Sequence, residues 1–316
     1  MGGLRTQRRV LLASALVIAA SAAITGCGAG AGPGTRNVSV LVTANFGASR
    51  VGEVGQRRIP GSETVMSLLE QHFKVTTSYG GGFVDSINGR AGGSGRTAWF
   101  YYVNGIEAPK GAAGTAVNAG DHIWWDLHSW AATQTTPAVV GSYPEPFTNG
   151  IGGKEFSILV DCAAGMQQEC DAIGSDVHHF GVKAADHTLA TRSGSDSLAV
   201  VVGTWTQVHN IVAAHLISAG PQQSGVFAQF GGGGHTLRLE NPLGDLARML
   251  RGSVGLVAAT GNGTLSAPTW FVTGTDAAGV RAAVGAFTKA HLDGHFAVAV
   301  DAGRVIPLPV TGSAGR

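Results

Sequence analysis

The first half of this 316-residue chain is organised around one stretch, Ala98-Trp99-Phe100-Tyr101-Tyr102-Val103-Asn104-Gly105. Its aromatic residues predict a β-strand, and the closing Asn-Gly dipeptide predicts a tight turn. Successive side chains of a strand point to opposite faces, so Trp99 and Tyr101 share one face while Phe100 and Tyr102 share the other. One of these two aromatic faces is expected to lie in a core.

The neighbouring segments supply the rest of a small domain. Strands are predicted near residues 37–45, 83–89 and 120–126, and apolar residues at helical spacing over residues 65–73 predict a helix that Ser62 or Thr64 caps. These parts favour one helix on a small mixed sheet. Because one helix covers only one face of a sheet, the second aromatic face needs another partner.

Four motifs follow one another along residues 61–125. They are Gly61-Ser62-Glu63-Thr64-Val65, Ser86-Ile87-Asn88-Gly89, Trp99-Phe100-Tyr101-Tyr102-Val103-Asn104-Gly105, and Gly120-Asp121 with Ile123 and Trp125. Together they resemble the transcobalamin-like C-terminal domain found in bacterial surface lipoproteins of unassigned function, over residues 37–131. The resemblance implies an α+β, β-grasp-like N-terminal domain and a ligand such as cobalamin or another corrinoid.

The second aromatic face offers candidate ligand contacts. Phe100, Tyr102 and Trp124 are predicted to contact the ligand or, as the alternative, to pack against a second domain. Both interpretations stay open at this point.

The N-terminus has the order of an export signal. Arg5, Arg8 and Arg9 precede an apolar run over residues 10–24. Ile24-Thr25-Gly26-Cys27 resembles a bacterial lipobox, which predicts a signal peptide over residues 1–26 and a lipidated Cys27, with an incidental cysteine as the alternative. Residues 27–36 are then a Gly-rich flexible tether, and the body is expected on the outer face of the bacterial cytoplasmic membrane. The Arg pair leaves the export route, general or twin-arginine, open.

The other two cysteines, Cys162 and Cys170, are a single pair in a chain expected in an oxidising compartment. A disulfide is the default prediction there. A zinc site built on cysteines is excluded because the chain has no further cysteine ligand.

The second half predicts an α/β domain over residues 154–310, after a linker rich in Pro, Thr and Gly over residues 132–153. Strands are expected near residues 156–160, 198–202, 226–230, 256–259, 270–273 and 296–300, and helices near residues 206–218 and 277–291. A strand, a Gly-Thr turn and an Ala-rich helix occur twice. Thr204 and Thr275 are natural helix caps, and the backbone N–H groups behind them are candidate anion ligands, with ordinary capped turns as the alternative.

Composition and motifs exclude several function classes. Lys and Arg number 21 against 20 Asp and Glu, which leaves no excess positive charge for a nucleic-acid partner. His178, His179 and His187, and His291 with His295, suggest metal sites, but exposed histidines are the better interpretation. No metal, no cofactor and no enzymatic activity is predicted, since nucleophile-elbow, zinc-protease and phosphate-loop motifs are absent from the sequence.

The sequence therefore predicts a membrane-anchored extracytoplasmic lipoprotein that binds a small molecule between its two domains. The resemblance implies cobalamin or a related corrinoid for uptake, with a membrane transporter as a further partner. One alternative is a surface structural or adhesion protein whose aromatics are buried between domains. Another is a cell-envelope hydrolase, which would need Ser, His and an acid in one cleft.

Overall fold

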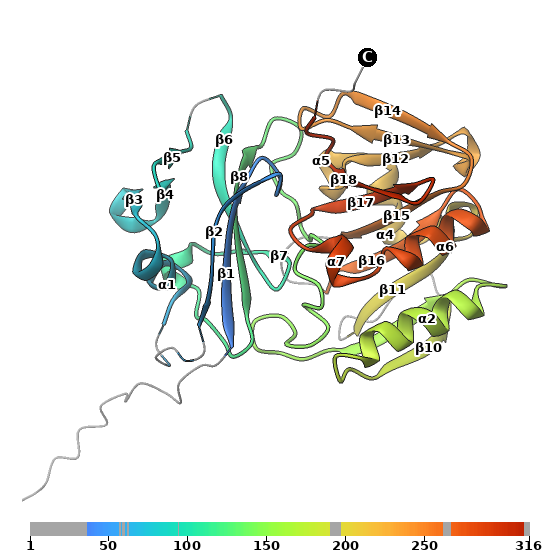
Figure 1. Ribbon diagram of the computed structural model, residues 1–316, viewed down its shortest axis with the longest axis horizontal. Helices are drawn as coiled ribbons and strands as arrows, with labels where there is room; N and C mark the ends of the chain where they lie inside the picture. Colours follow the sequence, from blue (N-terminus) through green and yellow to red (C-terminus); the bar gives the residue numbers. More distant parts are fainter. Residues whose placement is uncertain are drawn as a thin grey trace, which may run out of the picture.

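The computed structural model describes residues 37–312, apart from residues 57, 59–60, 62, 94, 190–196 and 262–266. The predicted signal peptide over residues 1–26, the lipidation site Cys27 and the tether over residues 27–36 lie outside the described residues. In the part of the chain that is described, no helix combines the length and the apolar character needed to cross a bilayer. The structure is a mixed α/β one in which sheets predominate, with two large sheets next to each other (Figure 1).

The N-terminal part, residues 37–131, is built on a five-stranded sheet with the order β2-β1-β8-β6-β7. Its elements are β1 (Val38–Ala44), β2 (Ser49–Gln56), α1 (Val65–His72), β3 (Val75–Ser78), β4 (Phe83–Ile87), β5 (Arg90–Ala91), β6 (Thr97–Val103), β7 (Ile106–Glu107) and β8 (His122–Ser129). β1 and β8 pair in parallel at the centre, and the other pairs of this sheet are antiparallel. Strands β3, β4 and β5 form a small separate sheet.

Helix α1 covers one face of the five-stranded sheet. Of the two predicted caps, Thr64 is the one observed, and its side chain accepts a hydrogen bond from the backbone N–H of Ser67 at 3.2 Å, while Ser62 lies outside the described residues. Leu68 and Leu69 are fully buried and belong to the same apolar cluster as Trp99 and Tyr101 of β6. This face is the core that the alternation of β6 predicted.

The C-terminal part, residues 154–312, is built on a seven-stranded sheet with the order β10-β9-β11-β16-β15-β17-β18. Its elements are β9 (Ser157–Cys162), α2 (Gln167–His178), β10 (Ala184–Thr188), β11 (Ser197–Thr204), α3 (Trp205–Val208), α4 (Val212–Ser218), α5 (Pro221–Ser224), β12 (Ala228–Gly231), β13 (Thr236–Glu240), β14 (Leu246–Arg251), β15 (Val254–Thr260), β16 (Thr269–Gly274), α6 (Ala277–Gly285), α7 (Lys289–Leu292), β17 (Ala297–Asp301) and β18 (Arg304–Leu308). The first four strands of the sheet are parallel and the last four are joined by antiparallel pairs.

Three layers form in this part. Helices α2 and α6 cover one face of the sheet, and α3, α4 and the small sheet β12-β13-β14 cover the other (Figure 1). The predicted helix over residues 206–218 is two short helices, α3 and α4, because the backbone at Ile211 is extended between them. The predicted helix over residues 277–291 is likewise divided into α6 and α7, with extended backbone at Thr288.

The segment over residues 132–153, predicted as a linker, is a buried strap between the two parts. Ala138, Val139 and Val140 are at most 2% exposed. The N–H of Val139 donates to the carbonyl of Gly105 at 2.8 Å, and the N–H of Val140 donates to the carbonyl of Phe296 at 3.1 Å. The strap is therefore bound to the N-terminal part at Val139 and to the C-terminal part at Val140.

The predicted disulfide is present between Cys162, at the end of β9, and Cys170, in α2. The two residues are separated by 8 positions, so the bond closes a short loop in the unfolded chain. We expect replacement of both cysteines by alanine to lower the free energy of unfolding by about 2.5 kcal/mol, mainly because the unfolded chain gains loop entropy.

Urea unfolding with and without reductant measures this difference. The reductant should shift the midpoint of the native protein towards that of the double variant and leave the variant unchanged. A midpoint of the native protein that does not respond to full reduction would contradict the prediction.

Candidate functional site

The outward aromatic face of β6 and β8 lies mostly inside the protein. Tyr102 and Trp124 are opposite each other in the strand register and are both fully buried. Their rings pack against Phe296 of the C-terminal part, with centroid distances of 5.6 and 5.1 Å. Phe227 belongs to the same cluster. These two residues therefore follow the alternative of interdomain packing and have no surface that a ligand can reach.

A buried polar network lies within the N-terminal part, beside this interface. The carboxylate of Asp126, which is fully buried, accepts hydrogen bonds from the backbone N–H groups of Phe46 at 3.0 Å and Gly47 at 2.9 Å and lies 2.9 Å from Nδ1 of His128. The indole N–H of Trp124 donates to the hydroxyl of Thr43 at 2.7 Å. Because these polar groups satisfy one another, the network fixes the N-terminal side of the interface without a ligand.

Phe100, the third predicted ligand contact, is not fully buried as Tyr102 and Trp124 are. Its ring stacks on His128 with a centroid distance of 4.4 Å, and the residue also lines a cavity of about 510 Å³. The cavity is also lined by Phe83, Gly93, Arg96, Thr97, Ala98, Trp99, Trp130 and Gln134. Phe83 is 40% exposed and Trp130 is 37% exposed. Accessible aromatic rings that line one cavity can provide flat apolar contacts for a ligand.

A second, polar cavity of about 480 Å³ continues from the first. Both cavities share Arg96, Trp130 and Gln134, and the second is also lined by Ala131, Ala132, Thr133, Thr135, Gln222 and Gln223. The two glutamines Gln222 and Gln223 come from α5 of the C-terminal part, so the cavity spans both parts. We call the two cavities together the aromatic cleft.

The aromatic cleft combines flat apolar walls with neutral hydrogen-bonding groups. The guanidinium of Arg96 lies over the ring of Trp130 at 5.8 Å and is the charged group that lines both cavities. Aromatic rings bind flat apolar surfaces, and side-chain amides donate and accept hydrogen bonds. This arrangement suits a ligand with a flat apolar face and a polar edge.

The two predicted threonine sites have internal partners. The hydroxyl of Thr204 bonds to the side-chain carbonyl of Gln207 at 2.9 Å in a capping box at the start of α3. Thr275 does not cap α6. That helix is capped by Asp276, whose carboxylate accepts from the N–H of Gly279 at 2.8 Å, while the Thr275 hydroxyl accepts from the N–H of Val254 at 2.9 Å. Because a carboxylate already occupies the N-terminus of α6, an anion has no place there.

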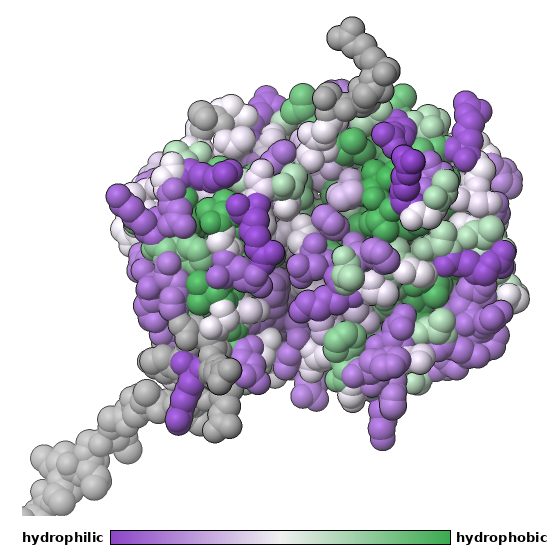
Figure 2. All heavy atoms as spheres, in the orientation of Figure 1, coloured by the Kyte–Doolittle hydropathy of each residue, from purple (hydrophilic) through white to green (hydrophobic). Residues whose placement is uncertain are grey.

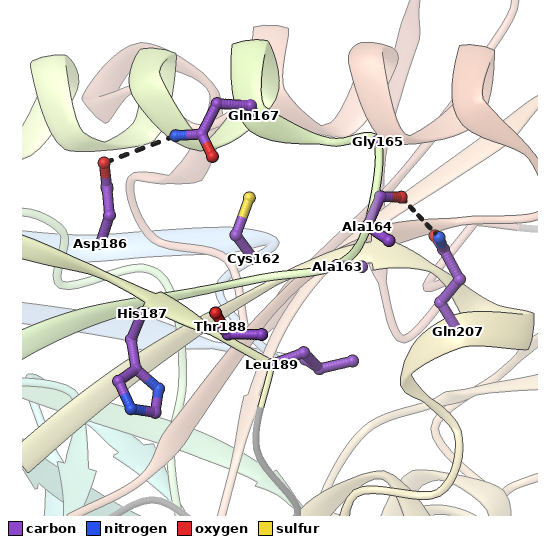
Figure 3. A pocket seen from close by; sticks show the side chains of 10 residues that line it. All are labelled: Cys162, Ala163, Ala164, Gly165, Gln167, Asp186, His187, Thr188, Leu189 and Gln207. Atoms are coloured by element: carbon purple, nitrogen blue, oxygen red, sulfur yellow. Dashed lines mark hydrogen bonds between the residues drawn. The ribbon is translucent and has the colours of Figure 1, made fainter.

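The carboxyl ends of the parallel strands carry another cavity, of about 590 Å³ (Figure 3). It lies where the strand order reverses between β9 and β11, the position at which open α/β sheets place ligands. Gln207 donates to the carbonyl of Ala164 at 2.9 Å, and Gln167 donates to Asp171 at 2.8 Å. The amides that line this cavity are thus already paired within the protein, which makes it a weaker candidate than the aromatic cleft.

A serine and a histidine lie close together among the described residues. Ser142 and His122 are 2.9 Å apart, but Ser142 is only 4% exposed. Of the histidines considered for metal binding, His187 pairs with the buried Asp161 at 3.0 Å. Within residues 37–312 as described, no three His, Cys, Asp or Glu side chains come together in a way that suits a metal ion.

Sequence reasoning missed most of the residues of the aromatic cleft. Phe83 begins a predicted strand, Trp130 lies after the predicted strand over residues 120–126, and Arg96 and Gln222 belong to loops or short helices without a periodic pattern. The one available signal was the aromatic face that contains Phe100, which predicted a partner but not its location.

Comparison with known proteins adds a family and a structural neighbour. Residues 62–129 match the model of a family described as a domain of unknown function, DUF4430. No curated protein matches the chain. Among solved structures the chain is similar to a crystal structure described as "a putative metal binding protein from Ruminococcus gnavus ATCC 29149", with 16% identity and a TM-score of 0.25, over 30% of this chain and 97% of that chain. At this score the similarity carries no argument about the site.

Proposed function

We propose that this chain is a non-enzymatic, extracytoplasmic lipoprotein, anchored through Cys27, whose body binds a small molecule in the aromatic cleft. The observation that carries the proposal is the cleft itself, where Phe83, Phe100 and Trp130 line a cavity that continues into one lined by three glutamines and Arg96. Ligand sites commonly combine apolar walls with a few polar groups in this way. A corrin ring with its amide side chains has the matching combination of a flat face and a polar edge.

The topology of the N-terminal part supports the resemblance to the transcobalamin-like domain. Its central parallel pair β1-β8, the flanking antiparallel strands and the single covering helix α1 are what a β-grasp-like module requires. A fold does not establish a ligand, so the corrinoid remains a proposal that binding must test. The exported address rests on residues 1–36 of the sequence, and a membrane transporter is the partner that an uptake role would need.

The test uses the chain from residue 37 onward, incubated with cyanocobalamin, desalted and examined by absorbance. We expect a retained corrin spectrum, and we expect Trp130→Ala and Phe83→Ala each to weaken binding about five- to tenfold, because each removes one stacking surface. Tyr79→Ala is the matched control, since Tyr79 is 91% exposed and lines neither cavity of the aromatic cleft.

A colourless protein would contradict the corrinoid version and leave the cleft for another ligand with a flat apolar face. Equal binding by the native protein and Trp130→Ala would contradict the cleft as the site.

The second candidate function is a surface structural or adhesion role. The burial of Tyr102 and Trp124 between the two parts favours it, because these aromatics already have a partner. This role predicts tryptophan fluorescence that does not respond to any added small molecule.

A further inference from the structure

A cavity of about 690 Å³ lies at the junction of the two parts and shares no lining residue with the aromatic cleft. We call it the junction cavity. It is lined by Val103, Ile106, Glu107, Ala108, Pro109, Lys110, Gly114, Thr115, Ala116 and Asn118 of the N-terminal part, by Ile151 and Gly152 of the strap, and by Lys154 and Phe156 of the C-terminal part. The proposed binding function uses none of these residues.

Glu107 of β7 is the acidic residue that lines the cavity. One of its carboxylate oxygens accepts a hydrogen bond from the backbone N–H of Thr136 at 2.6 Å. In the described part of the chain no ion pair compensates its charge. The hydroxyl of Tyr102, which interacts electrostatically with Glu107, and the hydroxyl of Thr136 are also buried. A carboxyl so placed can still accept a hydrogen bond from a ligand cation.

Two ammonium groups accompany this carboxyl around the cavity. Lys110 follows β7, and Lys154 precedes β9, where its ammonium lies 5.0 Å from the ring centre of Phe156. Ile106, Ile151 and Phe156 provide the apolar surface between the charged groups. The cavity therefore presents one acidic group, two basic groups and an apolar wall.

We infer that the junction cavity binds a short apolar peptide through its free termini, with the peptide's ammonium at Glu107 and its carboxylate at Lys110 and Lys154. A single negative or positive ligand would meet repulsion from one of these two sets, whereas a zwitterion matches both. The apolar side chains of the peptide lie against Ile106, Ile151 and Phe156. The volume lies within the range of ordinary small-ligand sites.

The inferred contact to Glu107 makes binding depend on pH. Burial raises the pKa of Glu107 to about 7 in the free protein, and the N–H of Thr136 opposes that rise. Lys110 and Lys154 are the other charged residues that line the cavity, and Tyr102 of β6 interacts electrostatically with Glu107. A ligand ammonium favours the ionised carboxylate, so binding releases a proton below pH 7 and affinity rises with pH.

The experiment is calorimetric titration of the protein with leucyl-leucine at pH 5.5 and pH 7.5. We expect about tenfold tighter binding at the higher pH, and about tenfold weaker binding at pH 7.5 for N-acetyl-leucyl-leucine, which lacks the ammonium. Leucyl-leucinamide, which lacks the carboxylate, should also bind about fivefold or more weakly. Each is a difference of roughly 1 kcal/mol or more.

Two variants separate the inference from a general effect on folding. Glu107→Gln should bind weakly and with the same affinity at both pH values, while Glu155→Gln, which changes an exposed neighbour outside the cavity, should bind as the native protein does. Glu107→Gln replaces a carboxyl whose charged form is disfavoured by burial with a neutral amide of the same shape, so the variant should remain folded. Weak binding by this variant would therefore not come from unfolding.

The inference is overturned if leucyl-leucine does not bind at millimolar concentration, if the acetylated peptide binds as tightly as the free one, or if Glu107→Gln keeps the pH dependence. The aromatic-cleft variant Trp130→Ala should bind leucyl-leucine normally. Failure of this site and failure of the proposed function are therefore separate results.

Discussion

Replacement of Phe296 by alanine is expected to lower the free energy of unfolding by about 3–5 kcal/mol. The ring is 2% exposed and contacts four rings of the N-terminal part, with centroid distances of 5.1–5.6 Å. Those rings belong to Phe46, Tyr102, Trp124 and His128. The substitution removes the common contact of this cluster and leaves a cavity at the interface, where no solvent-exposed group can relax to fill it.

Chemical unfolding followed by tryptophan fluorescence and by circular dichroism measures this effect. The native protein should unfold in one transition, whereas the variant should show two, because the interface couples the two parts. Tyr79→Ala, at a residue that is 91% exposed, should change stability by less than about 0.5 kcal/mol. A loss below 1 kcal/mol for Phe296→Ala would show that the cluster contributes little to the interface.

Glu107→Gln is expected to stabilise the protein at pH 8 by up to about 3 kcal/mol and to have almost no effect at pH 4. Burial raises the pKa of Glu107 to about 7, from 4.5 in an unfolded chain. The native protein holds the full stabilisation below pH 4.5, where the group is protonated in both states. It loses that stabilisation as the pH rises from 4.5 to 7, because only the unfolded state ionises readily over this range.

His122 is expected to give the opposite pH dependence, because its contribution to stability is lost towards acidic pH. Burial, opposed by Asp293 and assisted by Lys289, lowers the pKa of its imidazole to about 4. Stability from the neutral ring is complete above pH 6.5 and is lost as the pH falls towards 4. The free energy of unfolding of His122→Gln should therefore fall less than that of the native protein between pH 6.5 and pH 4. The difference should reach up to about 3 kcal/mol at the acidic end.

Urea unfolding of the two variants and the native protein at pH 4, 5.5, 7 and 8 compares these effects. The Glu107 variant should gain over the native protein towards alkaline pH and the His122 variant towards acidic pH. Parallel stability curves for all three proteins would show that neither group titrates differently in the folded and unfolded states.

Much of the fold was predictable because its signals are local. Strand β6 follows from its aromatic residues. The turn after it follows from Asn104, whose φ of 54° suits the left-handed turn position. Strand β10 and helix α2 were not predicted. β10 is mostly exposed at the sheet edge, and α2 carries Gly174 and several charged residues around the buried Cys170, Ile173 and Val177, which weakens its apolar period.

The site was less predictable than the fold because it depends on tertiary contacts. The sequence indicated that one aromatic face needed a partner, but it did not separate Phe100, which lines the cleft, from Tyr102 and Trp124, which meet the C-terminal part. The junction cavity was not predictable for the same reason. Glu107 and Lys154 are far apart in the chain, and only the fold brings them to one cavity.

The buried strap has a consequence for how quickly a ligand is exchanged. Two-part binding proteins often close about a flexible hinge, and the closing step then limits the observed rate. Here Val139 and Val140 pin the connecting chain to both parts, and Gly141 lies with its Cα against the backbone of His295, where even a methyl group would come within 2.5 Å. On the surface of the body, hydrophobic and hydrophilic residues are distributed over both parts (Figure 2). Because the strap fixes the two parts, the polar cavity, which has walls from both, is expected to be preformed. Association should follow a single exponential whose rate increases in proportion to ligand concentration, without a plateau from hinge closure.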